Sequence, residues 1–316
     1  MNRIRYSARP ALVAIASVLA LNACSLQRGT VPQSVSAYAV QTHSEQTGQP
    51  QKIYVANANS NSIKTYALDG SQTKPTITAA IDLPFSIAVD ANGKIYVANA
   101  GNDTITTYTA DGRQTSPTIA VHESNPDFGV QDVAVDGHGT IYVLDGSDGQ
   151  GGDVKTYNAD GSPGTLNFVV TKSNWPDFLA VDANGKIYVS VYFIDNNGPG
   201  AVFTFSPAGM RTTPTLHPLW PWGIAIGPQG NIYVASGPGV AAYTPDGKPT
   251  QPRISDRDRF GNGLAYGITV DSRGYVYAAN CASSPCGTVT TYNAGGKRTK
   301  PTITQGVAHP VDVAVH

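Results

Sequence analysis

The chain repeats one short pattern of apolar positions at nearly constant intervals. In six places an isoleucine or valine, a tyrosine and another apolar residue follow one another, and the tyrosines are 42 to 46 residues apart. These are Tyr54, Tyr96, Tyr142, Tyr188, Tyr233 and Tyr277. Three successive apolar residues, rather than strict alternation, predict a strand that is buried on both faces of its sheet.

Each repeat holds four strand signals separated by turns, as the second repeat illustrates. Strand A covers residues 86–90, strand B covers residues 95–97, strand C ends at Tyr108 and strand D carries Pro117. Asn-Gly and Asp-Gly pairs, which suit two-residue hairpins, separate A from B and C from D. Proline cannot donate to a sheet, so we expect strand D to be an outer edge strand.

Repeats of this length with four strands each are typical of propeller blades. We therefore expect residues 51–316 to form an all-β, six-bladed β-propeller with four antiparallel strands per blade. The repeat begins at a strand B near Lys52 and ends at a strand A over residues 311–315. This offset predicts that the C-terminal strand closes the first blade.

The repeat resembles a known family of propeller sequences. Residues 84–99 (PFSIAVDANGKIYVAN) look like an NHL repeat, and Tyr54-Val55-Ala56-Asn57 is similar to the YVTN type. The resemblance covers roughly residues 52–316 and implies the propeller fold. Propellers of this kind include protein-binding scaffolds, sensor domains, lyases and, more distantly, lactonases of the SMP-30/gluconolactonase group. The resemblance therefore does not choose among functions.

The N-terminal residues have the pattern of an export signal. Three arginines (Arg3, Arg5 and Arg9) precede an apolar stretch over residues 11–21, which is too short to span a bilayer. The stretch ends in Leu21-Asn22-Ala23-Cys24, which resembles the lipobox of bacterial lipoproteins. The resemblance implies that residues 1–23 are a signal peptide and that Cys24 is lipidated.

These features predict a location in the bacterial cell envelope. Residues 24–50 are polar and without strand periodicity, so we expect a flexible tether between the lipid and the propeller. By resemblance to the sorting rule of enterobacterial lipoproteins, Ser25 after the cysteine implies the outer membrane, facing the periplasm or the cell surface. In that oxidising compartment we expect Cys281 and Cys286 to form a disulfide, since a metal site would need further ligands.

Candidate binding residues concentrate on one face of the predicted ring. The B–C and D–A loops share this face and vary in length and composition, whereas the A–B and C–D turns are nearly uniform. Variable loops on a rigid scaffold are where function usually lies. The candidate ligand-binding residues are Phe85, Gln131, Asp132, Trp175, Asp177, His217, Trp220, Trp222, Tyr266 and Asp312. Aromatic residues with a few carboxylates suit a carbohydrate, a peptide or another protein, or else they plug the channel.

The residue types favour binding over catalysis. A nucleophile elbow, a Walker loop and a dinucleotide fingerprint are all absent from the sequence. With a net charge of −1, which is more negative without the leader arginines, we expect no nucleic-acid partner. The recurring aspartates before the A–B turns (Asp90, Asp136, Asp182 and Asp271) have the repetition of turn caps, because a catalytic residue would occur once.

Metal-dependent chemistry is the main alternative. His122, His217 and His309 precede strands A of alternate blades, as a zinc site could require, but their offsets differ. A lactonase would need an inner-strand glutamate, which is missing, and Asp132 and Asp312 come from blades that are not adjacent. A calcium loop at Asp145, Asp148 and Asp153 lacks the EF-hand spacing. We therefore expect no catalytic residues, no resident metal and no cofactor. A lactonase-like hydrolase, an NHL-type lyase and a purely structural envelope protein stay as alternatives.

Overall fold

The computed structural model describes most of the predicted propeller. Described are residues 51–121, 129–146, 151–171, 176–194, 198–237, 239–255, 265–281 and 287–316, without the side chains of residues 193, 194 and 198. The predicted signal peptide, Cys24 and the predicted tether lie outside the described residues. Within the described part, no helix is long and apolar enough to cross a membrane.

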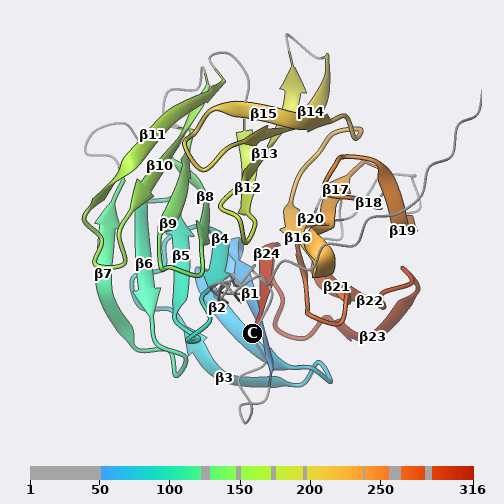
Figure 1. Ribbon diagram of the computed structural model, residues 1–316. Helices are drawn as coiled ribbons and strands as arrows, with labels where there is room; N and C mark the ends of the chain where they lie inside the picture. Colours follow the sequence, from blue (N-terminus) through green and yellow to red (C-terminus); the bar gives the residue numbers. More distant parts are fainter. Residues whose placement is uncertain are drawn as a thin grey trace, which may run out of the picture. The chain divides into compact units, whose positions relative to one another are not determined.

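The described strands form six antiparallel sheets of four strands, which confirms the predicted six-bladed propeller (Figure 1). Strands A are β24 (Pro310–Val315), β4 (Pro84–Val89), β8 (Val130–Val135), β12 (Pro176–Val181), β16 (Ile224–Ile226) and β20 (Ala265–Val270). Strands B are β1 (Lys52–Asn57), β5 (Ile95–Asn99), β9 (Ile141–Asp145), β13 (Ile187–Ile194), β17 (Ile232–Ser236) and β21 (Val276–Asn280). Strands C are β2 (Ser62–Ala67), β6 (Thr104–Tyr108), β10 (Gly152–Tyr157), β14 (Gly198–Phe205), β18 (Gly239–Tyr243) and β22 (Thr288–Tyr292). Strands D are β3 (Gln72–Ile77), β7 (Gln114–Ala120), β11 (Pro163–Thr171), β15 (Arg211–Leu216), β19 (Pro249–Ser255) and β23 (Arg298–Ile303).

The first blade is closed by the C-terminal strand, as predicted. Strand β24 pairs antiparallel with β1, with Val315 opposite Ile53 and Val313 opposite Val55. The amide of His316 also donates to the carbonyl of Lys52 at 3.0 Å. The inner strands of successive blades contact one another all around the ring, including β20 with β24 and β24 with β4.

The strands B are buried on both faces, as their continuous apolar runs predict. Ile53, Tyr54 and Val55 of β1 are at most 1% exposed. Among the described residues, six hydrophobic clusters each combine side chains of two neighbouring blades. Burial between blades is therefore what holds the sheets together.

The strand D prolines lie on outer edge strands, as predicted, and they also make contacts between blades. Each of five prolines packs against the glycine of the C–D turn in the next blade. A Cβ atom added to Gly112, for example, would lie 2.4 Å from Cβ of Pro75. Blade 3 has no proline at this place, and there Phe168 covers Gly209 instead.

The repeated aspartates before the A–B turns cap these turns, which confirms their predicted role. Asp90 Oδ1 accepts the amides of Asn92 at 2.8 Å and Lys94 at 3.0 Å, and Oδ2 accepts the hydroxyl of Tyr96 at 3.2 Å. Asp136, Asp182 and Asp271 make the same set of bonds in their blades. In these four blades, local hydrogen bonds of the aspartate thus hold the A–B turn in place.

Candidate functional site

At the opposite end of the inner strands, one register position is occupied by different residue types in different blades. This position lies four residues before the residue that follows each strand A (Asp90 in the second blade). Its residues are Ser86, Asp132, Phe178, Gly223, Gly267 and Asp312. The glycines lie where the neighbouring backbone comes close, since a Cβ at Gly267 would lie 2.2 Å from Oδ1 of Asp312. The other four carry side chains that link blades or line the axis.

Asp132, Ser86 and Asp312 form one buried polar chain across three blades. The hydroxyl of Ser86 donates to Oδ1 of Asp132, whose Oδ2 accepts the amide of Leu179 at 2.5 Å. Oδ2 of Asp312 accepts the amide of Ile87 at 3.1 Å. Each of these three side chains therefore reaches the inner strand of the next blade.

The two carboxyl groups influence each other electrostatically. Burial raises the pKa of Asp132 to about 7, against the opposing effect of its hydrogen bonds from Ser86, Leu179 and Val133. Burial, followed by the charge of Asp132, raises the pKa of Asp312 well above 3.8. The blades of these two residues are not adjacent, as the sequence predicted, and Ser86 of the intervening blade lies between them.

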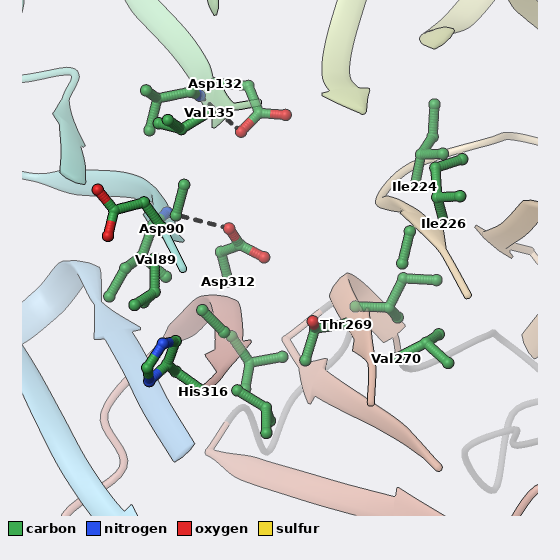
Figure 2. Close-up of a pocket in the computed structure, with 18 of the residues that line it drawn as sticks. Val89, Asp90, Asp132, Val135, Ile224, Ile226, Thr269, Val270, Asp312 and His316 are labelled. Carbon is green, nitrogen blue, oxygen red and sulfur yellow. Dashed lines mark hydrogen bonds between the residues drawn. The ribbon is translucent and has the colours of Figure 1, made fainter. Parts of the chain in front are cut away.

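A cavity follows the axis from these carboxyl groups toward the A–B turns. Its apolar walls come from the inner strands of all six blades, and its far end is bounded by Asp90, Asp136 and His316. Figure 2 shows the carboxyl groups of Asp132 and Asp312 across the cavity from Ile224 and Ile226. In the described part of the chain, the cavity lining contains no lysine or arginine.

An aromatic cluster lies at the D–A end of this cavity. Phe178 lines the cavity, and its ring lies 6.2 Å from that of Phe85 and 5.7 Å from that of Tyr266. The ring of Trp222 lies 4.1 Å from Tyr266, edge to face, and Tyr192 lies 5.3 Å from Trp222. The aromatic cluster thus comprises Phe85, Phe178, Tyr192, Trp222 and Tyr266. Of these five residues, Phe178 alone lines the cavity, so both interpretations of the aromatic residues, ligand binding and plugging of the channel, stay open.

Asp177 is a buried carboxyl group beside this cluster. Part of the residue reaches the surface, but its Oδ2 atom is buried and accepts no hydrogen bond from the described residues. Burial alone raises the pKa of Asp177 to about 7. Its charge in turn contributes, after burial, to the raised pKa values of Tyr192 and Tyr266. Buried polar atoms are normally paired, so Asp177 is the candidate for contact with a bound molecule.

The structure separates the predicted binding residues into two groups. Phe85, Trp222 and Tyr266 meet in the aromatic cluster, Asp177 lies beside it, and Asp132 and Asp312 lie at the cavity. Other predicted residues take no part in this arrangement: Gln131 donates to the carbonyl of Gly129, His217 is exposed, and Trp220 is half-exposed over Gly237. Trp175 and Cys286 lie outside the described residues, so the disulfide with Cys281 stays a prediction.

Three residues of the site are not among the predicted binding residues: Ser86, Phe178 and Tyr192. Ser86 and Phe178 share the register of Asp132 and Asp312, so an alignment of the six repeats would have identified them. Elsewhere, Asp145 of the considered calcium loop forms an ion pair with Lys155 at 2.5 Å. Within the described ranges, no three His, Cys, Asp or Glu side chains are grouped as metal ligands.

The fold and the site define a six-bladed propeller with an aromatic cluster over an acidic axial channel. Its fold is similar to a Bacteroides caccae protein of unknown function, with TM-score 0.64 and 15% identity over 84% of this chain and 99% of that one. It is also similar to virginiamycin B lyase from Staphylococcus aureus with quinupristin (TM-score 0.56, 14% identity, 87% and 92% covered). A gluconolactonase from Xanthomonas campestris is a third such structure (TM-score 0.54, 17% identity, 83% and 87% covered).

These likenesses show the fold and leave the activity open. They agree with the distant similarity to gluconolactonase-like propellers that the repeat implied. No protein-family model matches the chain, and no curated protein matches it in sequence. At identities this low, a shared propeller says nothing about a shared reaction.

Proposed function

We propose that this chain is a lipid-anchored binding protein of the bacterial cell envelope whose aromatic cluster and Asp177 hold a ligand or a segment of a partner. The observation that carries the proposal is the buried, unpartnered Oδ2 of Asp177 beside Tyr192, Trp222 and Tyr266. Aromatic surface with one convergent polar group is typical of small-ligand sites.

The binding proposal is tested by thermal unfolding of the purified chain with a panel of sugars, peptides and lactones. A ligand of the native state raises the midpoint of unfolding. Trp222→Ala and Tyr266→Ala should remove this shift, while Trp220→Ala, outside the aromatic cluster, should keep it. Binding that persists in both cluster variants would show that the site lies elsewhere.

The anchor proposal rests on the arginine-rich leader and the lipobox-like Leu21-Asn22-Ala23-Cys24. Acyl chains on Cys24 would hold the propeller at a membrane, which the leader pattern and Ser25 suggest is the outer one. Cys24→Ser should move the protein from the membrane fraction to the soluble fraction of the cell. A variant that still sediments with membranes would refute the anchor without touching the binding proposal.

A metal-dependent lactonase or lyase is the second candidate. The observation that favours it is the pair of neighbouring buried carboxyl groups, Asp132 and Asp312, beside a cavity on a fold that also occurs in a gluconolactonase and in virginiamycin B lyase. Elemental analysis combined with a lactone-hydrolysis assay distinguishes the two candidates. Stoichiometric metal and turnover, both lost in Asp132→Asn, would favour the enzyme over the binding protein.

A further inference from the structure

Negative charge at the D–A end of the axis is not balanced by any described basic side chain. Asp132 and Asp312 lie in a cavity whose described lining has no lysine or arginine, and Asp177 stands beside the aromatic cluster. In the described part of the chain, no lysine, arginine or histidine contributes to the pKa of Asp177, which burial raises. Asp132 and Asp177, whose pKa values burial raises to about 7, ionise above that pH, and the low dielectric constant of their surroundings then focuses a negative potential at this end of the axis.

We propose that the ligand of this site carries a protonated or quaternary amine, whose positive charge lies against Asp177 and the aromatic rings of Tyr192, Trp222 and Tyr266. This inference rests on the proposed binding function and names its ligand class. Cations are attracted to the faces of aromatic rings, most strongly to tryptophan, and pair with a carboxylate in the same site.

A neutral ligand would serve this site less well. Sugar hydroxyls can donate hydrogen bonds to Asp177, but they leave a carboxylate charge uncompensated in an apolar setting, which is costly. An anionic ligand would add repulsion from all three carboxyl groups. An organic cation supplies both the missing donor or counter-charge for Asp177 and a partner for the rings.

The test compares choline with 3,3-dimethylbutan-1-ol, its neutral isostere, by calorimetric titration of the purified chain. The two probes have the same shape and differ in charge, so their affinity ratio measures the preference for a cation. We expect choline to bind at least about tenfold more tightly, as a cation–π contact with a carboxylate would provide. Equal affinities for the two probes would overturn the inference.

Asp177, near the start of β12, and Asp182, directly after its end, provide matched variants. Asp177→Asn should reduce the preference for choline to less than about twofold, whereas Asp182→Asn, at the other end of β12, removes the same charge and should leave it unchanged. Trp222→Leu, which keeps apolar bulk but removes the aromatic ring, should weaken the binding of choline more than that of the neutral alcohol. A preference that survives Asp177→Asn, or that Asp182→Asn abolishes equally, would contradict the assignment.

Failure of this inference is distinguishable from failure of the proposed function. If choline does not bind but a neutral compound of the thermal panel does, and Trp222→Ala removes that binding, the site stands and its assigned ligand class is wrong. If choline binds with unchanged affinity to Trp222→Ala, Tyr266→Ala and Asp177→Asn, both the site and the ligand class are wrong.

Discussion

Strand β12 has an aspartate at each end, and the two residues have opposite surroundings. Asp182 accepts the amides of Asn184 at 2.9 Å and Lys186 at 3.0 Å and the hydroxyl of Tyr188 at 3.1 Å. Asp177, five residues earlier, has a buried Oδ2 atom that accepts no hydrogen bond from any described residue. The first arrangement recurs in four blades and stabilises a turn, whereas the second occurs in one blade and costs stability. The hydrogen bonds of Asp182 stabilise the fold, whereas Oδ2 of Asp177 is available to accept a hydrogen bond or to pair with the positive charge of a ligand.

The largest expected effect of this difference is on the pH dependence of the whole protein. Asp132, Asp177 and Asp312 have raised pKa values in the folded chain, so between about pH 4 and pH 7 the folded state binds more protons than the unfolded state. The free energy of unfolding should therefore be highest near pH 4 to 5 and fall toward pH 8, by about 4 kcal/mol from Asp177 alone.

Urea unfolding at a series of pH values measures this profile. Exposed turn carboxyls such as Asp69, whose pKa is lowered by its hydrogen bonds with Ser71, lose their effect only below about pH 4 and do not mask the decrease. Constant stability from pH 4 to pH 8 would mean that the three carboxyl groups are solvated rather than buried.

The next effect isolates the ligand end of β12. Asp177→Asn removes the buried charge with little change of shape, so it should stabilise the protein at pH 8 by roughly 2–4 kcal/mol and have almost no effect at pH 4. Chemical denaturation of variant and wild type at both pH values measures the difference. Destabilisation at pH 8 would show that Asp177 has a stabilising partner within the protein.

The turn end of the same strand should respond in the opposite direction. Asp182→Ala removes the acceptor of two amides and one hydroxyl, so the free energy of unfolding at pH 7 should fall by about 2 kcal/mol. Asp182→Asn, which keeps one acceptor oxygen, should lose less. If alanine at position 182 were neutral, the hydrogen bonds of the repeated turn would contribute nothing net, and the contrast between the two ends would disappear.

The smallest effect concerns the tyrosine that completes each turn. Tyr188→Phe removes one hydrogen bond to Asp182 and should cost about 1 kcal/mol at pH 7. Blade 5 offers a matched control, because Gly227 replaces the aspartate there and the equivalent Tyr233 packs against it without that bond. Tyr233→Phe should therefore be close to neutral, and equal losses in both blades would show that the hydroxyl is not what matters.

The sequence was sufficient to predict the features that repeat. Six copies of the tyrosine pattern defined the number of blades, and recurrence in four blades identified Asp182 as a turn cap. Single-copy features were harder: Phe85, Trp222 and Tyr266 were found as candidates, but Ser86 and Phe178 were overlooked because nothing in their own residue type suggests a site. Whether Asp177 has a hydrogen-bond donor depends on how neighbouring blades pack, and a local sequence pattern does not contain this information.

The pairing of β24 with β1 has a consequence for when the site can form. Asp312 enters the axial polar chain only from β24, and its bond to Ile87 joins residues 225 positions apart in the sequence. Contacts between such distant residues form late, after the loop-closure entropy has been overcome. During synthesis, five blades can be complete while the axis still lacks half of its carboxyl pair. The ring and its acidic centre therefore mature together, in one step, when β24 pairs with β1.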